Sequence, residues 1–116
     1  MIDNLDISQR LDFVAKGNTI FYRIMEFYND DDTPINITDY TFKLQVKTAP
    51  KGTLLIEFSE EEGNLTKFDD YIVLEQLIEI EAGKYYYDML VTKTGEQDYY
   101  LDGEFTVLTH ITEDTI

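Results

Sequence analysis

Residues 40 to 47 alternate strictly between apolar and polar side chains, and this alternation constrains the fold more than any other feature of the chain. The apolar positions are Tyr40, Phe42, Leu44 and Val46, and the polar ones are Thr41, Lys43, Gln45 and Lys47. A side-chain period of two is that of a β-strand with one face buried and the other in solvent. We therefore predict a half-buried strand here, which needs a second layer of structure to cover its apolar face.

Two further segments have strand character. Residues 84 to 92 repeat the alternation, with Tyr85, Tyr87, Met89 and Val91 on one face. Residues 19 to 28 carry large apolar side chains on both faces, which predicts a central strand covered on both sides.

Shorter strands are predicted at residues 54–58, 71–75, 78–80 and 99–107, with an edge strand within 6–15. Segments rich in Gly, Asn, Asp and Pro separate these runs, as turns require. Helix is limited to a single turn at 59–62 or 75–77. This pattern predicts an all-β protein, an antiparallel immunoglobulin-like β-sandwich of seven or eight strands. We expect one domain over residues 1–116, with its core at about 11–112. The residues predicted to be buried are Phe42, Leu44, Val46, Tyr87, Met89, Phe105 and Val107.

The start of the strand at residue 84 resembles the tyrosine corner of immunoglobulin-type domains. In that corner a tyrosine hydroxyl bonds to the upstream backbone, and the residue two positions later points into the core. Tyr85 takes the corner position, Tyr87 the core position, and Gly83 the tight turn before them. The alternative is an ordinary glycine turn followed by an aromatic strand.

Composition excludes several classes of function. The chain has 116 residues, no Cys and one His, with 24 acidic against 9 basic residues and a net charge of −15. Without cysteine there are no disulfides, thiolate zinc sites or cysteine nucleophiles. The charge disfavours nucleic acid and anionic membranes as partners. We find no signal peptide and no apolar run long enough to span a bilayer, and we expect a soluble protein without its own export signal.

Four segments, in order, resemble a module of phage virions. They are residues 16–19, 31–40, 82–89 and 101–107. Together they cover about residues 11–112 and are similar to the immunoglobulin-like domain at the start of tailed-phage baseplate upper proteins and of related tail or head-fibre accessory proteins. In that family a "GDT" opening, a "DG-P-DLTG" loop, a "GxYxYDL" corner and an "L-GxFxV" strand follow one another.

Four turn positions depart from the family pattern, each by a small side chain that also suits a turn: Asn18, Asp32, Asn36 and Asp39. Baseplate upper proteins continue into a long receptor-carrier region, so we expect this chain to be a free-standing version of the module.

The resemblance implies a non-enzymatic structural module of a baseplate, tail or head fibre. It would be assembled in the bacterial cytoplasm, bind other virion proteins, form homo-oligomers and need no cofactor. The alternative is a carbohydrate-binding or adhesin module whose surface tyrosines hold a glycan, for instance one on a host surface.

Individual candidate sites are few. Alternation places Tyr86 and Tyr100 on the face opposite Tyr85, Tyr87 and Tyr99, where this outward pair could anchor a protein or stack on a sugar; cross-strand packing is the structural alternative. Residues 29–32 put four oxygen-bearing side chains in one turn, but they lack the closing Glu of an EF-type loop, and we assign no metal site there. We assign no catalytic role to His110 or to any carboxylate pair, because no accompanying motif singles one out.

Overall fold

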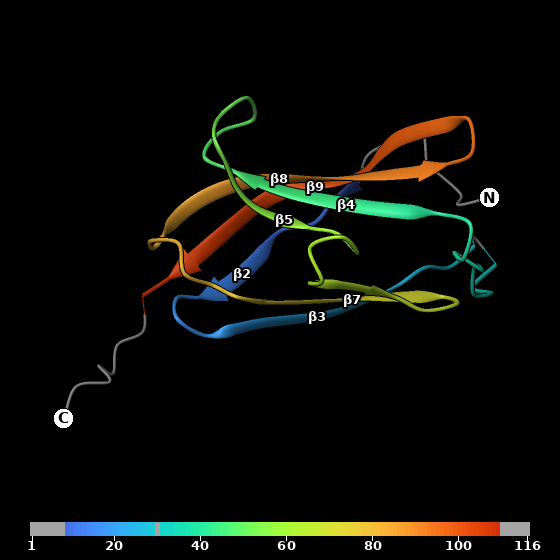
Figure 1. The fold of residues 1–116 in the computed structure, drawn as a ribbon, viewed down its shortest axis with the longest axis horizontal. Helices are drawn as coiled ribbons and strands as arrows, with labels where there is room; N and C mark the ends of the chain where they lie inside the picture. The colour runs from blue at the N-terminus through green and yellow to red at the C-terminus, as the bar shows by residue number, and fades with distance from the viewer. Residues whose placement is uncertain (1–8, 30, 110–116) are drawn as a thin grey trace.

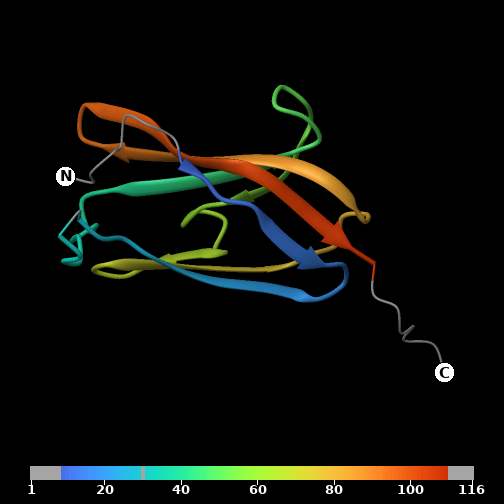
Figure 2. The same cartoon turned by 180° about the vertical axis from the view of Figure 1, so that it is seen from behind.

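The chain folds into two β-sheets that pack face to face, which confirms the all-β sandwich. The computed structural model describes residues 9–29 and 31–109, where it contains nine strands and no helix (Figures 1 and 2).

The larger sheet has the strand order β1-β9-β8-β4-β5, with β2 also paired to β9. Its strands are β1 (Gln9–Arg10), β2 (Phe13–Lys16), β4 (Thr41–Lys47), β5 (Leu54–Phe58), β8 (Gly83–Lys93) and β9 (Glu96–Leu108). The smaller sheet has the order β3-β7-β6, from β3 (Ile20–Glu26), β7 (Tyr71–Leu77) and β6 (Leu65–Lys67).

The pairing differs from the prediction at the start of the chain. β1 and β2 both run parallel to β9, whereas every other strand pair is antiparallel. The single edge strand predicted within residues 6–15 is therefore two short strands along one edge of the larger sheet. Residues 6–8 lie outside the described part of the chain.

The core follows the period-two pattern. All seven residues predicted to be buried are at most 4% exposed. Aromatic side chains from both sheets meet between the layers, and the Phe21 ring lies 5.1 Å from that of Phe105 and 5.9 Å from that of Phe58. The alternation of residues 40–47 thus has the physical cause inferred from it, a second sheet over its apolar face.

The prediction for residues 19–28 was wrong in one respect. β3 is an edge strand rather than a central one, and its outward side chains Ile20, Tyr22 and Ile24 are 59%, 49% and 55% exposed. Apolar residues on both faces of a strand usually mean cover on both sides. Here only the inward face, with Phe21 and Met25, packs on the core.

One other strand prediction was wrong, and one strand was missed. Residues 78–80 form a connection instead of a strand, although Ile78 is fully buried and its N–H donates to Thr19 O at 3.0 Å. β6 was not predicted. The described chain contains no helix, which agrees with the limit of at most one helical turn. Residues 75–77 extend β7. Residues 60–63 form a non-helical turn, in which the Ser59 hydroxyl accepts the Glu62 N–H at 3.2 Å.

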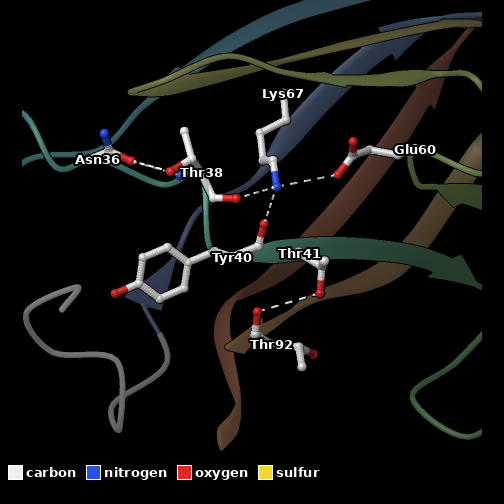
Figure 3. Close-up of polar contacts among 7 residues, drawn as sticks. All are labelled: Asn36, Thr38, Tyr40, Thr41, Glu60, Lys67 and Thr92. Atoms are coloured by element: carbon white, nitrogen blue, oxygen red, sulfur yellow. Dashed lines mark hydrogen bonds and ion pairs between the residues drawn. The ribbon is translucent and has the colours of Figure 1, made fainter. Parts of the chain in front are cut away.

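Lys67 connects the two sheets by hydrogen bonds. From β6 its ammonium donates to the carbonyl oxygens of Thr38 at 3.1 Å and Tyr40 at 2.6 Å, just before β4 begins (Figure 3). The carboxylate of Glu60 lies 3.7 Å away. The half-buried lysine therefore provides hydrogen bonds to two backbone carbonyls beside the start of β4.

The tyrosine corner is confirmed. The Tyr85 hydroxyl donates to Glu81 O at 2.6 Å, and Tyr87, two residues later, is 4% exposed in the core. The bond lies at the surface, so water can reach the Glu81 carbonyl.

Candidate functional site

The outer face of the larger sheet carries a small grid of polar side chains around Tyr86. Strand register places Lys47, Tyr86 and Glu104 in one row across β4, β8 and β9. Gln45, Asp88 and Asp102 form the next row. All six point away from the core, because their strand neighbours Val46, Tyr87 and Phe105 point into it.

A pocket of about 450 Å³ lies over this grid. Arg10 of β1 lines one side of it, and Ala49 and Pro50 line the other. In Figure 1 the connection between β4 and β5 rises from the sheet on the side away from the smaller sheet, which accounts for the second wall. The pocket has a size typical of sites for small ligands.

Some polar side chains of the pocket are already paired with neighbours, and others make no ion pair. Glu104 is held by Arg10 at 3.6 Å and by Lys84 at 3.4 Å. The side-chain amide of Gln45 donates a hydrogen bond from Nε2 to the Glu57 carboxylate at 2.8 Å. Lys47, Asp88 and Asp102 make no ion pair with any residue of the described chain. Burial raises the pKa of the Asp88 carboxyl, nearby Lys47 opposes the rise, and Asp102 adds to it.

Gly103 lets the N-terminal strap, formed by β1, β2 and their connection, pack close to the core-facing side of β9. A side chain at Gly103 would place its Cβ 2.3 Å from Leu11 O and 2.7 Å from Asp12 Oδ1. The same strap is held by Asp12 Oδ1, which accepts the Glu104 N–H at 2.9 Å, and by the Tyr87 hydroxyl, which donates to Leu11 O. Burial raises the pKa of that hydroxyl far above its ordinary value.

The outer face of the smaller sheet is a second candidate surface, and it is apolar. Ile20 of β3 pairs with Leu77 of β7, and Ile24 pairs with Val73. Tyr22 lies between them, opposite Glu75. We call the four aliphatic residues and the tyrosine of this surface the β3 face, namely Ile20, Tyr22, Ile24, Val73 and Leu77. An exposed apolar face of this kind is a candidate contact surface.

In the acidic turn that contains residues 29–32, side-chain oxygens stabilise the turn itself. Asp31 Oδ1 accepts the Thr33 hydroxyl at 2.6 Å and the Thr33 N–H at 3.1 Å, and these bonds lower the pKa of the Asp31 carboxyl. Asp32 adopts a positive φ of 66°. Asp30 lies outside the described residues. Within residues 9–29 and 31–109, no three His, Asp or Glu side chains are gathered as a metal site requires.

Of the predicted tyrosine pair, the structure describes one side chain. Tyr86 is half-buried in the outer-face pocket, on the opposite side of β8 from Tyr87. Its cross-strand neighbour is Glu104, while Tyr100 falls at the register shift of β9. The side chain of Tyr100 and all of His110 lie outside the description, so the role of the pair stays a prediction. The sequence did not single out Lys47, Asp88 or Asp102, because their meeting depends on strand register.

Comparisons with known proteins add no family. No protein-family model matches the chain, and no curated protein matches it. Among solved structures, the chain is similar to Drosophila OTK, extracellular domains 3-5, at 13% sequence identity and a TM-score of 0.40. The match covers 95% of this chain and 37% of that one, and it carries no functional conclusion. In the described residues there is no helix long and apolar enough to cross a bilayer.

Proposed function

We propose that this chain is a non-enzymatic assembly module that binds other protein subunits, and that it serves in the virion of a tailed phage. The observation that carries the binding role is the β3 face. Ile20, Tyr22 and Ile24 stand exposed on one edge strand, beside Leu77, which is 43% exposed. Leaving these side chains in water forgoes the stabilisation that covering them would bring.

Charge limits the partners of this face. A domain of net charge −15 repels its own copies at long range, so self-association has to depend on short-range apolar contacts. A more basic virion protein would instead be attracted. The proposed partners are therefore further copies of the chain, at an ionic strength that screens the repulsion, or a basic neighbouring subunit.

The virion setting rests on the order of the four short segments that resemble the phage module. A chain without cysteine suits assembly in the reducing bacterial cytoplasm, which is where virions form. Genes for terminase, portal and tail proteins beside this one would support the setting. A neighbourhood of unrelated metabolic genes would contradict it.

Sedimentation velocity over a salt series tests the binding role. We expect the chain to self-associate, and the association to strengthen or persist as salt rises. Ile24→Lys should abolish it by placing a charge in the centre of the β3 face. Val14→Lys is the matched control, since Val14 is 49% exposed on β2 of the other sheet. A strict monomer at every salt and protein concentration, or equal effects of the two variants, would contradict self-association through the β3 face.

A further inference from the structure

We propose that the Tyr86 pocket on the outer face of the larger sheet binds a neutral saccharide. This site lies on the sheet that does not carry the β3 face, so the inference goes beyond the assembly role and stands or fails separately from it. It is carried by the size of the pocket, the residues that line it and the balance of their charges.

The size of the polar grid suits a sugar unit. Neighbouring strands lie about 4.8 Å apart, and side chains two residues apart on one strand lie about 7 Å apart. The rows that run from β4 to β9 therefore present a patch of about 10 by 7 Å. Pro50 and Arg10 bound this patch on two sides, within a pocket of about 450 Å³.

The side chains supply what a sugar ring needs. One face of a pyranose is lined with C–H groups and packs well on an aromatic ring, which Tyr86 provides at the centre of its row. Sugar hydroxyls both donate and accept hydrogen bonds. The carboxylates of Asp88 and Asp102 are acceptors, and the ammonium of Lys47 is a donor.

The charges favour a neutral ligand over an ion. Two cations, Arg10 and Lys47, and three carboxylates, Asp88, Asp102 and Glu104, line the pocket. Asp88 and Asp102, directly opposite each other on β8 and β9, would repel an anion. Lys47 would repel a cation from the same space. A polyhydroxyl compound can bond to both kinds of group without a net charge of its own.

The groups that would bind the sugar are free to do so. Lys47, Asp88 and Asp102 have no ion-pair partner in the described chain, whereas Glu104 and Gln45 are already engaged. Asp88 is exposed on this face between two buried neighbours, so its carboxylate is accessible to a ligand. Hydrogen bonds from sugar hydroxyls would replace hydrogen bonds to water at these groups.

Titration of the ¹⁵N-labelled chain with cellotriose, maltotriose and chitotriose, followed by NMR, tests the proposal. At least one sugar should shift the backbone amides around Tyr86, Asp88 and Asp102. We expect Tyr86→Ala to weaken that binding about tenfold through loss of ring stacking, and Tyr86→Phe to retain it. Tyr28→Ala is the matched control, because Tyr28 is an exposed tyrosine outside both the pocket and the β3 face, and its loss should leave sugar binding unchanged.

Three results would overturn the proposal. One is the absence of shifts with all three sugars. Another is that the sugar shifts amides of the β3 face instead of the pocket, or that the same shifts persist in a Tyr86→Ala variant whose spectrum without sugar is native. The third is binding of arginine amide at the pocket in place of every sugar, which would make this a site for a cationic side chain.

Discussion

The hydroxyls of Tyr85 and Tyr40 differ in hydrogen bonding, so replacing each tyrosine by phenylalanine should change stability in opposite directions. Tyr85 donates to Glu81 O at 2.6 Å, so Tyr85→Phe removes a made hydrogen bond. Because water reaches that carbonyl, the loss should be modest, about 1 kcal/mol in the free energy of unfolding. Urea denaturation measures it, and an unchanged midpoint and slope would mean that the corner bond adds nothing.

The Tyr40 hydroxyl is the converse case. It is buried, and no atom of the described chain hydrogen-bonds to it. A buried polar group without a partner costs about 1 to 3 kcal/mol. Tyr40→Phe keeps the ring beneath the Lys93 ammonium, 5.4 Å from its centroid, and removes the unpaired oxygen. We expect the variant to unfold at higher urea concentration than the wild type; a lower midpoint would reveal a partner for this hydroxyl.

Asp88 should make stability depend on pH in the sense opposite to that of most carboxylates. Burial raises its pKa in the folded state above the unfolded value of 3.8, so the folded chain binds the proton more tightly. Its ionised form therefore costs stability at neutral pH, and this cost disappears as pH falls through the folded pKa.

Asp88→Asn removes that ionisation. We expect the variant to be more stable than the wild type at pH 7, with the difference shrinking as the pH is lowered towards 4. Chemical denaturation of both proteins at several pH values measures the difference. A gap that is constant across this range would show that the titration of Asp88 is not its source.

At the scale of elements, the strap formed by β1, β2 and their connection can pack closely on β9 because β9 has a glycine, with no side chain, at the point of contact. Gly103→Ala would push its Cβ into Leu11 O, a backbone atom that cannot rotate away. We expect a loss of about 2 to 3 kcal/mol and faster amide exchange at Leu11, whose N–H donates to Asp102 O at 2.9 Å.

Gly17→Ala is the control for this substitution. Its nearest contacts would be Leu108 O at 3.7 Å and a methyl carbon of Val107 at 3.8 Å, which are ordinary van der Waals distances. The variant should keep both the stability and the exchange rates of the wild type. If Gly103→Ala behaves in the same way, close packing of the strap on Gly103 does not contribute to stability.

For the whole molecule, net charge should govern thermal stability. A charge of −15 on a domain of 116 residues repels itself in the compact state, and the Debye length falls from about 30 Å at 0.01 M salt to about 8 Å at 0.15 M. We therefore expect the melting temperature to rise by several degrees over that range in calorimetry. A flat or falling melting temperature would mean that local ion pairs, such as Lys84 with Glu104, outweigh the global repulsion.

Local pattern was enough to predict the layered β-fold. The strict alternation of residues 40–47 and the boundaries of β5 need no knowledge of distant residues, because a period of two demands one buried face. The tyrosine corner was also readable, since Gly83, Tyr85 and Tyr87 lie within five residues of one another and the hydroxyl bonds only four residues back.

What the sequence could not decide is which strands are neighbours and what lies beyond each face. Residues 19–28 are equally apolar whether one face of the strand or both are covered, and only the arrangement of the described chain in two layers leaves the outer face of β3 and β7 open. The Tyr86 pocket joins side chains from positions 10 to 104, and it exists only because strand register sets Lys47, Tyr86 and Glu104 in one row. Register depends on contacts between residues far apart in the chain, and a shift of one residue would turn each of those side chains into the core.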